Sequence, residues 1–198
     1  MTKYLRELFS GILSKIAEKI NTWGINPNTI TVFGVLGNCL AACFIALGNL
    51  VIGGIIVFFM GFMDALDGAV ARVNGKSNKF GAMLDSFSDR YSEILIYFGL
   101  LVYLLGNGNQ TGVILVFAAL SGSVLVSYVR ARAESLNLDC EVGIMTRLER
   151  YLTTVAMLLS GYIQMGLLII AILSHFTAIH RMAYSRRQIK YQDEEKNL

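Results

Sequence analysis

The sequence predicts an all-α integral membrane protein with six transmembrane helices and an amphipathic juxtamembrane helix at its N-terminus. Of its 198 residues, 55% are hydrophobic and 16% are charged, whereas soluble domains carry nearer a quarter charged residues. Residues 20–63, 94–129 and 151–180 contain no Asp, Glu, Lys or Arg. Each of these segments is longer than the roughly 20 residues that one helical crossing needs. We therefore expect each segment to cross the membrane twice.

Residues 1–22 mix charged and apolar side chains with the period of a helix. They lack the continuous apolar core of a secretory signal. A helix lying along the membrane surface fits this pattern. A helix packed against the rest of the protein fits it equally well.

Each uncharged segment has a polar or glycine-rich break near its middle, which predicts three helical hairpins. The breaks are Gly48-Asn49, residues 106–110 and residues 161–164. The expected spans are 30–48, 50–72, 82–105, 111–133, 149–164 and 166–183. The third pair is short, and one long tilted helix over residues 151–180 is the alternative. That helix would leave the basic residues after position 180 outside, so we favour two passes.

All seventeen Lys and Arg residues lie outside the three uncharged segments. The positive-inside rule then places the hairpin bases and both termini in the cytoplasm, in a multi-pass protein of the cell membrane. We expect one six-span domain over residues 23–185 and a charged cytoplasmic tail over residues 186–198. The last eight residues, YQDEEKNL, are expected to be disordered.

Four acidic residues have helical spacing where the second span ends and the third begins. They are Asp64, Asp67, Asp85 and Asp89. A polar loop over residues 72–80 separates the two pairs, so antiparallel neighbouring helices would bring the carboxylates together. Four ionised carboxylates need counter-charge, and oxygen ligands without His or Cys favour Mg²⁺ or Mn²⁺. The alternative is a set of charges at helix ends paired with Lys and Arg. A diphosphate is the usual companion of such ions.

The spacing D-x₂-D-G-x₂-A-R-x₈-G-x₃-D-x₃-D, which starts at Asp64 and ends at Asp89, resembles the signature of the CDP-alcohol phosphotransferases. This resemblance implies that a CDP-linked alcohol such as CDP-diacylglycerol gives its phosphoryl-alcohol group to an acceptor hydroxyl and releases CMP. It makes Asp64, Asp67 and Asp85 metal ligands, and Asp89 the general base and a further metal ligand. It also implies a homodimer. The donor-binding residues that it implies are Asn28, Thr31, Asp67, Gly68, Ala71, Arg72, Ser77 and Gly81.

The segment "NPNTIT", residues 26–31, also has a simpler interpretation as an ordinary helix start. In that interpretation Pro27 and Asn28 interrupt the chain and Asn28 or Thr29 caps the first span. The two interpretations are compatible, and the helix start is the one we favour.

Basic residues gather at the ends of the fourth, fifth and sixth spans. "SYVRARAE" and the later G-x₃-R-x-E-R resemble the family branch that makes phosphatidylinositol phosphate or its archaeal ether-lipid counterpart. The acceptor-phosphate residues implied are Ser127, Arg130, Arg132, Arg147, Arg150 and Arg181. Arginine forks match phosphate geometry, although the positive-inside rule also places arginines at such helix ends.

Three functions stay open on the sequence. The first is transfer to inositol 1-phosphate, and the second is transfer to glycerol 3-phosphate, as in a phosphatidylglycerophosphate synthase. The third, from another class, is a divalent-cation channel or transporter, because acid-lined membrane helices can also pass Mg²⁺. No feature indicates a nucleic-acid partner.

Overall fold

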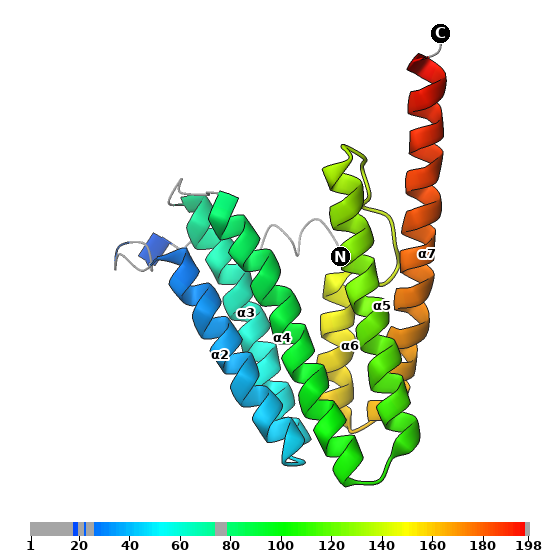
Figure 1. The fold of residues 1–198 in the computed structure, drawn as a ribbon. Helices are drawn as coiled ribbons and strands as arrows, with labels where there is room; N and C mark the ends of the chain where they lie inside the picture. Colours follow the sequence, from blue (N-terminus) through cyan, green and yellow to red (C-terminus); the bar gives the residue numbers. More distant parts are fainter. Residues whose placement is uncertain (1–17, 20–21, 23–25, 74–78, 197–198) are drawn as a thin grey trace. The chain divides into compact units, whose positions relative to one another are not determined.

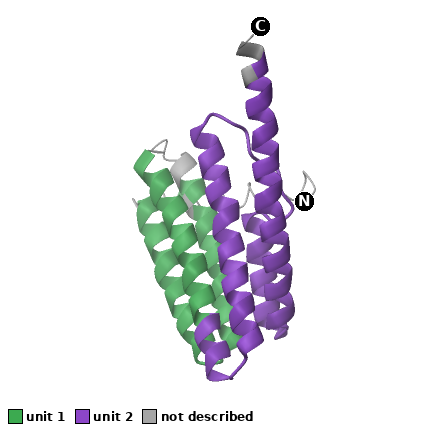
Figure 2. Ribbon diagram, turned by 45° about the vertical axis from the view of Figure 1, so that its right-hand side comes forward, with its two compact units in different colours: residues 1–99 green, residues 100–198 purple. Residues whose placement is uncertain are grey.

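The computed structural model describes residues 18–19, 22, 26–73 and 79–196, and in this part of the chain the regular elements are helices. Figure 1 shows their order along the chain. They are α2 (Pro27–Ala46), α3 (Leu50–Val73), α4 (Lys79–Gly106), α5 (Gln110–Ser135), α6 (Arg147–Ser160) and α7 (Ile163–Lys196). The chain divides into two compact units, Met1–Gly99 and Leu100–Leu198, and the boundary falls inside α4 (Figure 2).

The first unit is held together by close helix contacts at small residues. Helix α2 packs along α3 after a tight turn in which Gly48 has φ 86°. A Cβ atom built on Gly53 of α3 would lie 2.4 Å from Cγ1 of Ile45. A Cβ atom on Gly99 of α4 would lie 2.5 Å from the carbonyl oxygen of Ala42 on α2. Membrane helices commonly pack through such small residues, because these let the backbones approach.

In the second unit α7 packs against both α5 and α6. Helix α5 begins at a capped turn, where the Oδ1 atom of Asn109 accepts a hydrogen bond of 2.9 Å from the Gly112 N–H. Helix α6 begins with a capping box between Thr146 and Glu149. It ends at Gly161, whose φ of 78° suits glycine because it has no Cβ.

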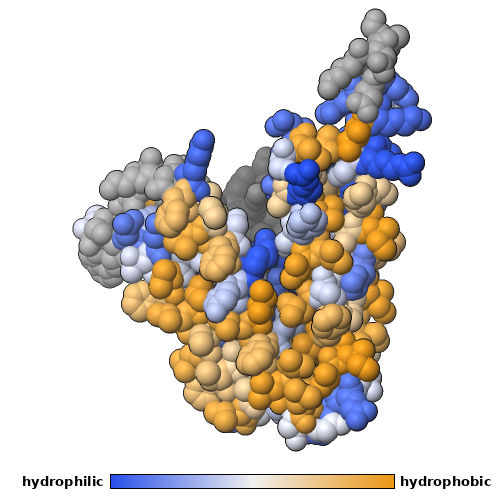
Figure 3. Space-filling model, viewed as in Figure 1, coloured by the Kyte–Doolittle hydropathy of each residue, from blue (hydrophilic) through white to orange (hydrophobic). Residues whose placement is uncertain are grey.

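Four helices in the described part of the chain are long and apolar enough to cross a membrane: Pro27–Ala46, Leu50–Val70, Gln110–Ser135 and Ile163–Gln192. Helix α6 has only 14 residues, and the first turns of α4 carry charged residues. Figure 3 shows hydrophobic side chains over much of the visible surface. Phe33, Phe117 and Ile179, for example, are 61%, 74% and 70% exposed. A large exposed apolar surface is expected where lipid replaces water, so the all-α membrane fold class is supported.

The breaks between helices occur where the sequence predicts them, at residues 47–49, 107–109 and 161–162. Each of the six expected spans has a helix at its position, although two of the six fall short of the length or apolarity of a full crossing. Most of the expected amphipathic helix over residues 1–22 lies outside the described residues. Residues 18, 19 and 22 are helical.

Two expectations for the chain ends are wrong. The last eight residues were expected to be disordered, but the six of them that the structure describes belong to α7, which continues through Lys196. This segment contains no Gly or Pro, and Lys190 and Glu194 form an i,i+4 ion pair with 3.7 Å between Nζ and Oε1. The N-cap of α2 is Asn26, without a side-chain cap, and not Asn28 or Thr29. Helix α2 starts directly at Pro27, because the fixed φ of proline suits the first helical position.

Candidate active site

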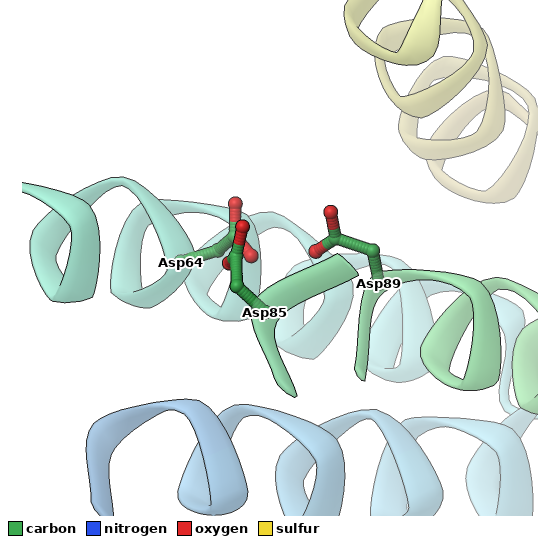
Figure 4. Close-up of side chains that lie close together, drawn as sticks. All are labelled: Asp64, Asp85 and Asp89. Carbon is green, nitrogen blue, oxygen red and sulfur yellow. The ribbon is translucent and has the colours of Figure 1, made fainter. Parts of the chain in front are cut away.

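Three of the four aspartates predicted to converge lie side by side in the first unit. Asp64 comes from α3, and Asp85 and Asp89 come from successive turns of α4 (Figure 4). Their carboxylate oxygens lie within 4.8 Å of one another, and each residue is half-buried. The backbone of Asp67 lies in α3 one turn after Asp64, but its side chain is outside the part of the structure that is described.

These carboxylates form a site that suits hard divalent cations. Two unit charges 4.8 Å apart repel by roughly 3.5 kcal/mol at an effective dielectric constant of about 20. A bound cation removes this repulsion. Oxygens on opposite sides of one Mg²⁺ are at most about 4.2 Å apart, so a small rotation of the side chains, or two ions about 4 Å apart, would engage all three groups. The donor set therefore fits Mg²⁺ or Mn²⁺.

The residues expected to bind the donor belong to the same unit. Ile30 of α2 packs with Ala69 and Val70 of α3, so the start of α2 lies beside the end of α3. Half-buried Asn28 and Thr31 are thereby brought to the end of α3 that carries Asp64.

The remaining donor residues lie on α3, on α4 or in the connection between these helices. Gly68 follows Asp64 by one helical turn, and Gly81 precedes Asp85 by one turn; both are half-buried. The Thr31 hydroxyl donates to the carbonyl of Pro27 at 3.2 Å. Ser77 lies outside the described residues, as do the side chains of Ala71 and Arg72.

All six residues expected to bind the acceptor phosphate lie in the second unit, and two of them are buried. Arg150 on α6 is 1% exposed and Arg181 on α7 is 3% exposed. The Nε and Nη1 atoms of Arg181 donate to the carbonyls of Val142 and Val126, each at 2.8 Å. Nη1 of Arg150 donates to the carbonyl of Met145 at 3.3 Å.

The other four acceptor residues lie at the end of α5 and the start of α6. Arg130 on α5 forms a 2.7 Å ion pair with Glu134 and lies within electrostatic range of Arg181. Arg132 and Arg147 are exposed. The Ser127 hydroxyl donates to the carbonyl of Ser123 at 3.2 Å.

Further polar residues of α7, which are not among the acceptor residues predicted from the sequence, lie beside this basic cluster. They are Thr177, Ser185 and Gln188, which lie on the same helix face as Arg181. Their spacing of i, i+4, i+8 and i+11 is one side chain per turn. That periodicity is visible in the sequence, but it does not identify the segment that these side chains contact.

Comparison with known proteins shows the family to which this chain belongs. Residues 24–179 match the family model described as CDP-alcohol phosphatidyltransferase. The archaetidylinositol phosphate synthase of Methanothermobacter thermautotrophicus is 36% identical over 196 residues, covering 96% of this chain and 96% of that protein.

Solved structures of the phosphatidylinositol phosphate synthase of Mycobacterium tuberculosis have the same fold. The structure with CDP-DAG bound has a TM-score of 0.82 and 28% identity, and the match covers 88% of this chain and 93% of the other. A second structure of that enzyme, in complex with manganese and citrate, also has a TM-score of 0.82 at 28% identity, with 87% and 88% covered. The chain therefore belongs to the CDP-alcohol phosphatidyltransferase family of enzymes.

Proposed function

We propose that this enzyme transfers a phosphatidyl group, or its archaeal ether-lipid counterpart, from a CDP-linked lipid to a hydroxyl of inositol 1-phosphate and releases CMP. The observation that carries the proposal is the convergence of Asp64, Asp85 and Asp89 within 4.8 Å, in a chain 36% identical to a protein named archaetidylinositol phosphate synthase. Family membership favours this transferase over the divalent-cation channel or transporter.

Asp64, Asp67, Asp85 and Asp89 would hold Mg²⁺ or Mn²⁺ in this enzyme. The manganese in a related structure supports this assignment. When bound, the ions neutralise the diphosphate and stabilise charge on the departing CMP. Asn28, Thr31, Gly68, Ala71, Arg72, Ser77 and Gly81 would line the donor site.

Asp89 would act as the general base. Its carboxylate accepts the proton of the acceptor hydroxyl. The hydroxyl oxygen then bonds to the lipid-linked phosphorus of the donor as the bond from that phosphorus to the CMP oxygen breaks. The lipid phosphoryl group passes to the acceptor in one displacement, with inversion at phosphorus, and CMP leaves with the bonding electrons.

The basic cluster of the second unit would bind the phosphate of the acceptor. Arg150 and Arg181 support this assignment because both are buried and donate to backbone carbonyls. The carbonyls of Val126 and Val142 carry dipoles but no net charge, so they do not neutralise the Arg181 guanidinium that a phosphate would meet. Ser127, Arg130, Arg132 and Arg147 would complete the site. Glycerol 3-phosphate, another small phosphomonoester, is the second candidate acceptor.

A lipid-tailed donor stays in the bilayer while its nucleotide head stays in water. Six spans with both termini and the aspartates at the cytoplasmic face of the cell membrane would meet both demands. We also propose that the enzyme is a homodimer, as the family resemblance implies.

The test is acceptor competition in purified enzyme with one CDP-linked lipid, Mg²⁺ or Mn²⁺, and equal amounts of inositol 1-phosphate, glycerol 3-phosphate, inositol and serine. We expect a product of inositol 1-phosphate and stoichiometric CMP. A product of glycerol 3-phosphate alone would overturn the acceptor assignment.

Asp89→Asn is expected to abolish CMP release in the same assay while leaving the protein folded. Glu194→Gln, which neutralises an exposed acid near the C-terminus, is the matched control. Turnover by folded Asp89→Asn would count against its role as base.

A further inference from the structure

The segment that joins α5 to α6 is bonded along α7 over three turns of that helix. We call residues 138–146 the strap. At its start, Gln188 exchanges two hydrogen bonds with the backbone of Asp139: the Asp139 N–H donates at 3.2 Å, and the carbonyl accepts at 2.8 Å. Next, the Ser185 hydroxyl donates to the Cys140 sulfur at 3.7 Å.

The contacts continue toward the start of α6. Arg181 donates to the carbonyl of Val142 at 2.8 Å. The Met145 N–H donates to Oγ1 of Thr177 at 3.1 Å. A Cβ atom on Gly143, whose φ is 137°, would lie 2.4 Å from Cγ2 of Thr177. Successive turns of α7 therefore bond to successive parts of the strap, and only glycine fits at its closest approach.

Parts of the strap are buried beside α7. Leu138, Cys140 and Met145 are 4%, 1% and 2% exposed, and Thr177 is fully buried. A buried backbone N–H that loses its partner is costly. The hydroxyl of Thr177 therefore fixes the position of Met145.

Met145 in turn links this hydroxyl to an arginine of the basic cluster. Its N–H donates to Thr177 on α7, and its carbonyl accepts from Nη1 of Arg150 on α6 at 3.3 Å. Arg181 likewise bridges the strap at Val142 and α5 at Val126. Both buried arginines are thus oriented by strap carbonyls, and the strap is oriented by α7.

We infer that Thr177 and Gln188 are positioning residues for the acceptor phosphate: through the strap they set where Arg150 and Arg181 present their charge. This inference rests on the proposed function, since it assigns the basic cluster to a phosphorylated acceptor. It predicts an effect on acceptor affinity that is separate from donor binding and from chemistry at the aspartates.

The test is steady-state kinetics of Thr177→Val, which keeps the side-chain shape and removes the hydroxyl. The KM for the phosphorylated acceptor should rise roughly tenfold, while kcat, the donor KM and the Mn²⁺ requirement stay within about twofold of the unaltered enzyme. Thr177→Ser keeps the hydroxyl and should restore the acceptor KM. Thr153→Val is the matched control, because Thr153 lies on α6 and its hydroxyl donates within that helix, to the Glu149 carbonyl at 2.8 Å.

Inorganic phosphate supplies a second readout that does not depend on which polyol is the acceptor. It should inhibit competitively against the acceptor, and Thr177→Val should raise its inhibition constant by the same factor as the acceptor KM. An unchanged acceptor KM, or equal losses in kcat and both KM values, would overturn the inference.

If Thr177→Val does not fold, Gln188→Leu decides the question. We expect a rise in acceptor KM of about threefold, and no rise overturns the inference. If glycerol 3-phosphate proves to be the acceptor, the assignment of inositol 1-phosphate is wrong. The same shifts in KM measured with glycerol 3-phosphate would still support Thr177 and Gln188 as positioning residues.

Discussion

Neutralising one aspartate of the cluster should have opposite effects on the metal-free and the metal-bound enzyme. The change is Asp85→Asn, which keeps the side-chain size and removes one of three charges whose oxygens lie within 4.8 Å. Two of the groups near Asp85 are acids, Asp64 on α3 and Asp89 on its own helix. In the absence of a cation, its charge therefore enters two repulsive pairs.

The repulsion sets the expected size of the effect. At an effective dielectric constant of about 20, each pair costs roughly 3.5 kcal/mol at 4.8 Å. Because the three carboxylates are partly exposed, solvent and salt reduce the repulsion of each pair to about 1 kcal/mol. Asp85→Asn should therefore stabilise the metal-free protein by about 2 kcal/mol. In a chain of this length that corresponds to a rise in Tm of about 4–8 °C.

The assay is thermal unfolding of the purified enzyme in detergent at pH 8, in chelator and across a Mn²⁺ titration. A cation at 100 times its Kd stabilises the protein that binds it by about 2.7 kcal/mol. The unaltered enzyme should thus gain Tm on adding Mn²⁺, while Asp85→Asn starts higher and gains less. Glu194→Gln removes an exposed acid from the end of α7, and both Tm values should stay within about 2 °C, because its exposed ion pair with Lys190 contributes about 0.5 kcal/mol or less. An Asp85→Asn protein that melts below the unaltered enzyme in chelator, or that keeps the full gain with Mn²⁺, would refute the reasoning.

Two further changes test the packing that supports the site. Gly99→Ala places a Cβ atom 2.5 Å from the carbonyl oxygen of Ala42, so α4 must move away from α2. The free energy of unfolding should fall by about 1–3 kcal/mol, and the Mn²⁺ titration should show a weaker affinity for the ion. Gly106→Ala, on the same helix with open space around the new methyl group, should show neither loss, and equal behaviour of the two variants would contradict the contact. Asn109→Ala removes the cap of α5 and the 2.8 Å hydrogen bond from Gln164. Tm should fall by the equivalent of about 1 kcal/mol, while kcat for CMP release stays unchanged. A Tm that does not change would show that the cap contributes nothing to stability.

The positions of the helices followed from the sequence because lipid leaves the backbone few options. A segment in hydrocarbon must satisfy its own N–H and C=O groups, so long uncharged runs become helices. Polar or glycine breaks end these runs, as at Gly48 and Gly161. The spacing of Asp85 and Asp89 was equally local, because side chains one helical turn apart share a face, whereas their meeting with Asp64 depends on the packing of α4 beside α3.

The structure contradicts two predictions from the sequence, at the start of α2 and in the tail, where two local signals competed. Asn28 and Thr29 are good capping residues, but Pro27 fits the first helical position and α2 starts there. The tail YQDEEKNL has a composition typical of disorder, yet Glu194 pairs with Lys190 one helical turn earlier, and α7 extends through Lys196.

The sequence by itself determined the membrane class, the order of helices, the acidic motif and the family resemblance. Only the tertiary structure decided which polar residues support the arginines: Thr177 contacts Met145 across 32 positions of the chain, and Arg181 contacts Val126 across 55. The physical reason is that periodicity reports which face of a helix a residue occupies, but the partner of that face is chosen by packing between distant segments. The strap has neither helical nor strand periodicity, and its path is set by hydrogen bonds to α7, which are buried at Cys140 and Met145 and exposed at Asp139.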